Sequence, residues 1–454
     1  MPADFVRTLI AVFLALPLAN ANSAEETWLE FRGPGAQGHA ASSQVPLSWS
    51  ATENVAWKTP IAGRGWSSPV ISGDRIWMTT AVESPVSEED IKRRLSTAKG
   101  HTGGLTVAGP VSMRLVCVDR RDGKQLYDVE LLHVDAPDPL HKINSYASPT
   151  PILDGDRIYC HFGTYGTAAI EAATGHILWK QRFEIDHMVG PGSSPILHGN
   201  LLILTCDGSD KQFIVAVDKA TGNMVWKVDR PPIDSKDGDM RKSFCTPLIV
   251  KHDGREQMIV PGAQWFVSYN PQSGEELWRI KHGSGFSIVP RPVCENGIVY
   301  LCTGFTKAKL WAVRIDGRGD VTDTHVAWQS DRQIPLRPSP LLVDGSLYVV
   351  SDTGVATCFD AATGKIHWTK RLPGNYSASP LLVGGRIYYF GEEGKTTVIK
   401  PGPQFEQLAV NTLDEGCMAS AAALDGALYV RTRGHLYRIE SPKTARAIGA
   451  TGSP

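Results

Sequence analysis

A short pattern recurs along the chain: a small or acidic residue, then Gly four positions later, then Trp four positions after the Gly. The copies are Glu171–Gly175–Trp179, Asp218–Gly222–Trp226, Asn270–Gly274–Trp278 and Asp360–Gly364–Trp368. Asp119–Gly123–Tyr127 is the same pattern with another aromatic residue at its end. Recurrence at a regular interval is typical of repeat architectures, in which each unit packs against its neighbours. The 454 residues are therefore expected to form one large repeat domain instead of several unrelated domains.

A second pattern marks the start of each unit. Seven starts have a large apolar residue eight positions after a Pro or Ala: Pro69–Trp77, Pro151–Tyr159, Pro195–Ile203, Pro292–Tyr300, Pro340–Tyr348, Pro380–Tyr388 and Ala421–Tyr429. An eighth start, at Pro247, has a longer turn. Gly-containing turns inside these segments supply the positive φ angles of tight hairpins. Four antiparallel strands in roughly 40–50 residues correspond to one propeller blade. The sequence thus predicts an all-β fold, an eight-bladed β-propeller of four-stranded antiparallel blades.

The two ends of the repeat region are expected to meet. The last unit, from Ala419, provides only three strands, and the missing outer strand is predicted from Asn54–Thr59, where Trp57 occupies the repeat Trp position. Such pairing closes the ring and removes exposed sheet edges. The predicted division is 1–24 signal peptide, 25–53 lead segment, 54–440 propeller and 441–454 flexible tail. A long insertion, Ala81–Ser112, contains a capping-box pattern, Ser87-Glu-Glu-Asp90, that predicts a short helix.

The start of the chain has the composition of a secretory signal. Arg7 precedes an apolar run, residues 8–19, and small residues follow it. An uncleaved membrane anchor stays open as the alternative, although the run is short for a membrane span. The chain is therefore expected to be exported, to the periplasm or the extracellular space, with no transmembrane segment after signal removal. With 46 basic and 47 acidic residues, it lacks the basic excess of a nucleic-acid-binding protein.

The eight cysteines do not form a recognisable site. Cys117 and Cys358 occupy a strand position where other repeats have Ala or Ser, so they are interpreted as small buried apolar residues. No C-x-x-C or C-x-x-C-H pattern occurs, and we predict no metal, c-type haem or thiol-redox site. One or two disulfides, and the oligomeric state, stay open.

The recurring tryptophans are predicted to be structural. Equivalent residues in several blades cannot all face one central ligand, so each ring is expected to pack on the Gly turn of the next blade, with its indole N–H bonded to backbone. The predicted set is Trp57, Trp179, Trp226, Trp278, Trp328 and Trp368.

These repeats resemble those of quinoprotein dehydrogenases, which bind pyrroloquinoline quinone (PQQ). Residues 216–226 match the family's docking motif Ala-x-Asp-x-x-Thr-Gly-x-x-x-Trp in full. The same repeats occur in the non-enzymatic propeller lipoprotein of the barrel-assembly machinery. The chain also looks like exported quinone-repeat-like propellers of planctomycete-type bacteria. The segments behind this likeness are Phe31-Arg-Gly-Pro-Gly35, Gly63–Pro69, Gly319–His325 and Asn375–Pro380.

The resemblance implies the fold more strongly than an activity. The dehydrogenases typically have two adjacent cysteines beside the cofactor, and this chain has none. Neither a Ca²⁺ site nor the catalytic carboxylate can be transferred residue by residue, so no catalytic residue and no metal ligand is predicted.

A candidate ligand site lies where the loops that enter the inner strands gather at one face of the ring. The predicted ligand-binding residues are Trp66, His141, Lys142, Tyr146, Arg241, Lys242, Phe244, Arg337, Asn375 and Tyr376. Cationic groups beside aromatic rings suit an anionic planar ligand or an acidic glycan. The alternative is that these residues fill the channel mouth and cap strand ends.

The preferred interpretation is a ligand- or protein-binding assembly scaffold in the cell envelope, without enzymatic activity or a cofactor. Its partner would be an envelope protein or a small anionic or glycan ligand. One alternative is a PQQ-dependent dehydrogenase of an alcohol or sugar, with Ca²⁺. A second is a polysaccharide-active enzyme.

Overall fold

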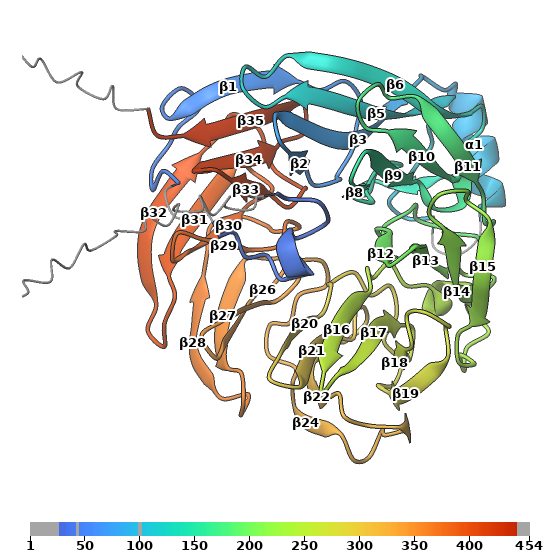
Figure 1. The fold of residues 1–454 in the computed structure, drawn as a ribbon, viewed down its shortest axis with the longest axis vertical. Coiled ribbons are helices and arrows are strands. Elements are labelled where there is room, and N and C mark those ends of the chain that lie inside the picture. The colour runs from blue at the N-terminus through green and yellow to red at the C-terminus, as the bar shows by residue number, and fades with distance from the viewer. Residues whose placement is uncertain (1–26, 42–44, 99–101, 443–454) are drawn as a thin grey trace, which may run out of the picture.

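The eight-bladed propeller is confirmed. A computed structural model describes residues 27–41, 45–98 and 102–442, which form eight blades around a central channel, seven of four strands and one of four strands extended by a fifth (Figure 1). The predicted signal peptide and the tail from residue 443 lie outside the described residues.

Each blade runs from an inner strand at the channel to an outer strand at the rim. Blades one to three are β2 (Val70–Ser72), β3 (Arg75–Glu83), β5 (Val111–Asp119), β6 (Gln125–Val134); β8 (Ile152–Asp154), β9 (Arg157–His161), β10 (Thr167–Glu171), β11 (Ile177–Gln181); and β12 (Ile196–His198), β13 (Leu201–Asp207), β14 (Gln212–Asp218), β15 (Met224–Asp229). Blades four and five are β16 (Leu248–His252), β17 (Arg255–Gly262), β18 (Trp265–Tyr269), β19 (Glu276–Lys281) with a fifth strand β23 (Gly319–Asp320); and β20 (Val293–Glu295), β21 (Ile298–Cys302), β22 (Leu310–Arg314), β24 (Val326–Ser330).

The last three blades complete the ring. They are β25 (Leu341–Val343), β26 (Ser346–Val350), β27 (Val355–Asp360), β28 (Ile366–Arg371); β29 (Leu381–Val383), β30 (Arg386–Phe390), β31 (Lys395–Lys400), β32 (Glu406–Thr412); and β33 (Ala422–Leu424), β34 (Ala427–Arg431), β35 (His435–Glu440), β1 (Val55–Pro60). The other elements are α1 (Glu88–Thr97), the pair β4 (Leu105–Thr106) and β7 (Leu140–His141), and the 3-10 turns η1 (Pro34–Ala36), η2 (Gly163–Tyr165) and η3 (Gly238–Arg241).

The ring closes through an N-terminal strand, as predicted. Strand β1 pairs antiparallel with β35, with Thr59 opposite Leu436. The Trp57 indole N–H donates to the Arg120 carbonyl of blade one at 3.1 Å. Its ring lies so close to Gly123 that a Cβ there would be 2.7 Å from a ring carbon. The eighth blade is therefore held to the first by backbone pairing and by an indole contact.

Most of the other repeat tryptophans pack in the same way. The Trp179 ring lies on Gly222 of the next blade, and Trp328 lies on Gly364. The indole N–H groups of Trp179, Trp328 and Trp368 donate to backbone carbonyls at 3.2, 2.9 and 3.1 Å. The ring thus contacts a residue of the next blade that must lack a side chain, which explains why Gly and Trp recur together in the repeat. Trp226 lies on Gly274, but its buried indole nitrogen has no hydrogen-bond partner among the described residues.

Trp278 departs from this arrangement. Its indole N–H donates 2.7 Å to the side chain of Gln257, in its own blade, and the residue is fully buried. Blade five replaces the Gly turn with a longer hairpin whose strand β23 pairs in parallel with β19, placing Gly319 opposite Trp278. The extra strand covers the outer edge of blade four, so the indole is enclosed instead of docked on a neighbouring turn.

The N-terminal segment, residues 27–41, crosses the centre of the ring (Figure 1, dark blue). Trp28 forms an isolated antiparallel β-bridge with Ile71 on β2, and the Leu29 carbonyl accepts a hydrogen bond from the Leu153 N–H on β8. Near its other end, the Ala40 N–H donates to Leu382 on β29. We call residues 27–41 the N-terminal plug, because they contact inner strands on several sides of the channel.

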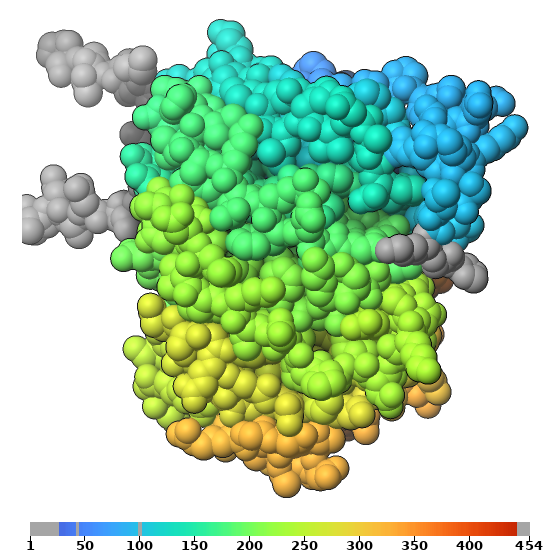
Figure 2. All heavy atoms as spheres, turned by 90° about the vertical axis from the view of Figure 1, so that its right-hand side faces the viewer, coloured from blue at the N-terminus to red at the C-terminus, as the bar shows by residue number. Residues whose placement is uncertain are grey.

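The insertion of blade one carries the predicted short helix. Ser87 caps α1, accepting from the Asp90 N–H at 3.2 Å. In the edge-on view of Figure 2, the α1 segment (blue) projects from one face of the ring. No helix in the described ranges is long and apolar enough to cross a membrane. All eight cysteines are free thiols, and only Cys294 is incompletely buried.

Candidate functional site

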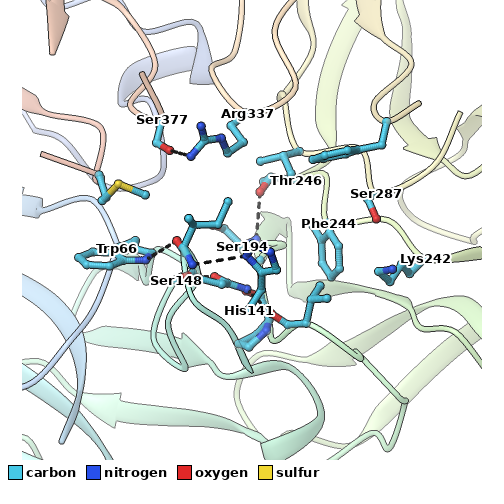
Figure 3. Close-up of a pocket in the computed structure, with 18 of the residues that line it drawn as sticks. Trp66, His141, Ser148, Ser194, Lys242, Phe244, Thr246, Ser287, Arg337 and Ser377 are labelled. Atoms are coloured by element: carbon cyan, nitrogen blue, oxygen red, sulfur yellow. Dashed lines mark hydrogen bonds between the residues drawn. The ribbon is translucent and has the colours of Figure 1, made fainter. Parts of the chain in front are cut away.

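A cavity of about 440 Å³ lies at the mouth of the channel. Its lining includes residues that lie two positions before the inner strands of five blades, namely Thr150, Ser194, Thr246, Ser379 and Ser420. Phe31, from the N-terminal plug, also lines it. The plug therefore contributes to the lining of this pocket, which we call the channel-mouth pocket (Figure 3).

Hydroxyl groups connect neighbouring blades around this mouth. The residue two positions before each inner strand is Ser or Thr in seven of eight blades: Ser68, Thr150, Ser194, Thr246, Ser339, Ser379 and Ser420. In most of them the hydroxyl oxygen accepts the backbone N–H of the equivalent residue one blade earlier, at 2.9–3.0 Å. We call this set the hydroxyl ring. Because each of these bonds uses the oxygen as acceptor, the hydroxyl hydrogens stay available as donors toward the pocket.

The hydroxyl ring is a feature that the sequence reasoning missed. Its signal was present, since the hydroxyl residue directly precedes the repeated Pro in most units. Pro has no N–H and restricts the residue before it to extended conformations. That restriction helps to hold each Ser or Thr that precedes a Pro at an equivalent place around the channel.

Aromatic and apolar side chains form the pocket wall. Trp66 stands at one side, with its indole N–H donating 3.1 Å to the Ile143 carbonyl. Phe244 lines the opposite part (Figure 3). Phe286 and Phe305 lie with ring centroids 6.3 Å apart. These flat apolar faces favour a planar or apolar occupant.

The cationic residues of the pocket already have carboxylate partners. The Arg337 Nε lies 2.5 Å from Asp352 Oδ1, and its Nη1 lies 2.9 Å from Glu392 Oε1. Lys242 forms an ion pair with Asp239, which itself lines the pocket. These cations therefore carry compensated charge.

The surroundings of two basic side chains, Lys242 and His141, also disfavour their charged forms. Burial lowers the pKa of Lys242 to about 8, and its Nζ lies 5.7 Å from the Phe286 ring centroid. Burial and the nearby Lys142 lower the pKa of His141 below its ordinary value. A neutral imidazole at this position can donate or accept a hydrogen bond without adding charge to the pocket.

The structure brings together half of the predicted ligand-binding residues. Trp66, His141, Lys242, Phe244 and Arg337 line the pocket. The others lie outside its lining: Lys142, Tyr146, Arg241, Asn375 and Tyr376.

Those five residues have local contacts that account for them. Tyr146 and Tyr376 are buried, and their hydroxyls donate to loop carbonyls at 2.7 and 2.9 Å. Arg241 donates to the Gln212 side chain at 3.2 Å, and Asn375 to that of Glu393 at 2.8 Å. Lys142 is exposed. Apart from Lys142, these side chains support the loops, which is the alternative that the sequence left open.

The donor set does not fit the cofactors that the resemblance implies. PQQ is a planar molecule with several carboxylates, which need unpaired cations, whereas Lys242 and Arg337 are paired with Asp or Glu side chains. Over the described ranges, no group of three or more His, Cys, Asp or Glu side chains is arranged to hold a metal ion. A Ca²⁺ site built from several protein oxygens therefore has no acidic cluster to build on here.

Comparison with known proteins identifies relatives of most of the repeat region. The family described as "Outer membrane protein assembly factor BamB" matches residues 72–252, 210–342 and 308–401. Tetrathionate hydrolase of Acidithiobacillus ferrooxidans is 20% identical over 355 residues, which cover 74% of this chain and 65% of that protein. Quinoprotein alcohol dehydrogenase PedH of Pseudomonas putida is 29% identical over 163 residues, 33% of this chain and 25% of that protein. The chain thus spans less than two thirds of the length of these relatives.

Solved structures show the same fold at low identity. BamB from Moraxella catarrhalis superposes with a TM-score of 0.52 and 13% identity, covering 74% of this chain and 99% of that one. Quinohemoprotein alcohol dehydrogenase from Comamonas testosteroni superposes with a TM-score of 0.63 and 12% identity, covering 93% and 82%. Because the family match extends from residue 72 to residue 401, across most of the propeller, the chain belongs to the BamB family of PQQ-repeat β-propellers.

Proposed function

We propose that this protein is an exported assembly scaffold of the cell envelope whose channel-mouth pocket receives an aromatic side chain of a partner protein. The observation that carries the proposal is the aromatic wall of the pocket, combined with cations whose charge is already compensated. The description of the family as an assembly factor supports a protein partner.

The wall has exposed apolar surface that a partner could cover. Phe305 is 37% exposed and Ile143 is 38% exposed, and both line the pocket. Large apolar groups gathered at an open hollow are typical of interaction sites. Burying a partner's aromatic ring against them would also exclude water from the hydroxyl ring.

The floor and the wall offer different interactions to such a ring. Hydroxyl hydrogens of Thr150 and Ser194 can donate to an acceptor oxygen, while Trp66 and Phe244 can stack on or pack edge-to-face with an aromatic face. A tyrosine side chain or a ring next to a backbone carbonyl satisfies both requirements. The partner is therefore expected to present an aromatic residue in an exposed loop or chain end.

Site-specific photo-cross-linking tests this proposal. We expect benzoylphenylalanine at Phe305 to capture one defined envelope protein, whereas the same group at Met224, a 56% exposed residue of outer strand β15, captures none. The variant Trp66→Ala should weaken capture at 305 at least about tenfold, the effect of losing roughly 1.4 kcal/mol of aromatic contact. Equal capture at both positions, or capture unaffected by Trp66→Ala, would contradict the assigned face.

The dehydrogenase alternative has its own measurement. PQQ titrated with Ca²⁺ should leave the intrinsic fluorescence without a saturable change, because the paired cations of the pocket offer carboxylates no unpaired partner. Saturable binding together with alcohol-dependent dye reduction would replace the scaffold by a quinoprotein dehydrogenase. The polysaccharide-active alternative stays a prediction.

A further inference from the structure

A buried arginine in the N-terminal plug has hydrogen-bond donors that the protein does not use. Arg32 is 2% exposed and follows Phe31, which lines the pocket. Its Nη2 donates to the carbonyls of Gln37 and Pro340, both at 2.7 Å. Its Nε and Nη1 are buried and meet no acceptor anywhere in the ranges 27–41, 45–98 and 102–442. Buried polar groups in folded proteins are almost always hydrogen-bonded, so these donors require an occupant.

The charge of Arg32 is also uncompensated. The neighbouring carboxylate, Glu30, is engaged by Arg291, whose Nη1 lies 3.0 Å from Glu30 Oε2 and donates 2.6 Å to the Phe31 carbonyl. These three ionisable groups together carry one net positive charge. Burial, and then repulsion by Arg291, lower the pKa of Arg32 to about 9, so the guanidinium is still charged at neutral pH. A buried ion without a counter-charge is strongly destabilising.

The backbone at Arg32 adds a second cost. Its φ is +70°, a left-handed conformation that a non-Gly residue rarely adopts. Gly38 must lack a side chain, since a Cβ there would lie 2.8 Å from Arg32 Nη2. Such strain persists where the surrounding structure holds a residue in place, and it is concentrated at ligand clamps. The segment Phe31–Gly35, which the sequence singled out, therefore places one cation at a defined point in the channel at a cost in stability.

We propose that the Arg32 guanidinium binds a small monovalent anion of the chloride class inside the channel. One negative charge balances the single net positive charge of Arg32, Arg291 and Glu30. The enclosure of the side chain requires a small occupant, which excludes a carboxylate-bearing ligand the size of a sugar acid. A water molecule would satisfy the N–H groups but would leave the charge unbalanced. The inference does not depend on what occupies the pocket above.

Bromide diffraction and chloride-dependent stability test the site independently. Crystals of the unmodified protein soaked in sodium bromide should show an anomalous peak within hydrogen-bond distance of Arg32 Nη1 or Nε. In sodium gluconate of constant ionic strength, replacing gluconate by chloride should raise the melting temperature by about 2 °C per tenfold chloride once chloride is well above the dissociation constant of the site.

Two variants separate specific binding from general salt effects. Arg32→Met should abolish the chloride dependence, whereas Arg332→Met, at an exposed arginine, should keep it unchanged. Electron density beside Arg32 without an anomalous signal would indicate water instead of bromide and would overturn the proposal. So would a chloride dependence that survives in Arg32→Met. If that variant does not fold, the diffraction result alone decides.

Discussion

The substitution Gly222→Ala tests whether indole docking holds the blades together. Gly222 has φ +77°, and a Cβ added there would lie 2.8 Å from two ring carbons of Trp179. The ring cannot easily move away, because its N–H donates to the Lys219 carbonyl at 3.2 Å. Its centroid also lies 6.1 Å from that of the Tyr159 ring. A methyl group at this position therefore meets both backbone strain and a steric clash.

A glycine in the same blade separates these two costs. Gly199 also has a positive φ, +55°, but a Cβ there would meet nothing within 4 Å. Gly199→Ala should cost only the left-handed backbone strain, about 1–2 kcal/mol. Gly222→Ala adds overpacking of about 1–3 kcal/mol, for a total of about 2–5 kcal/mol.

Urea unfolding of the single and double variants measures these terms. In a Trp179→Ala background the clash is absent, so Gly222→Ala should cost only about 1–2 kcal/mol there. The double variant should therefore be about 1–3 kcal/mol more stable than the sum of the two single substitutions predicts. If Gly222→Ala and Gly199→Ala destabilise equally, or if the double variant shows no coupling, the ring does not press on the turn as described.

Three further predictions concern acid stability, the thiols and ring closure. Burial lowers the pKa of His282 to about 4, so the unfolded state binds more protons between about pH 6.5 and 4, and stability falls as the pH falls through that window. His282→Gln should reduce the dependence of the unfolding free energy on pH by the equivalent of about one proton, as denaturation midpoints at several pH values would show. Ellman's reagent should find eight thiols in the denatured chain and at most that of Cys294 in the native one; fewer than eight in the denatured chain would reveal a disulfide. Trp57→Ala removes the indole that lies on Gly123 and should destabilise by about 3 kcal/mol in thermal unfolding.

The fold could be predicted because its determinants are local and repeated. In the turn of blade three, Asp218 Oδ1 accepts from the backbone N–H of Ala220 and Thr221, and the Gly222 N–H donates to the Asp218 carbonyl. All of these contacts lie within five residues, so the sequence itself contains them. Trp278 shows the limit of that reasoning, because its environment depends on a hairpin contributed by the next blade.

The site was harder to predict because side-chain direction is not local. Tyr146 and Tyr376 lie in loops at the correct face, but their rings turn into the core and only their hydroxyls meet loop carbonyls. The plug has no repeat pattern to reveal it, and its main contact, from Arg32 to the Pro340 carbonyl, spans 308 positions. Only the closed ring brings such residues together.

Arg291 shows how the fold and the site are connected. Among the equivalent positions two residues before the inner strands, its position is the one that is not Ser or Thr, yet its backbone N–H still donates to Ser339 Oγ at 3.0 Å. Its side chain reaches the Pro247 carbonyl of the neighbouring blade and both Glu30 and the Phe31 carbonyl of the plug. A hydroxyl residue at this position would continue the ring but is too short to reach those groups. The departure from the repeat therefore anchors the plug, and because Phe31 lines the pocket, it also anchors a residue of the site.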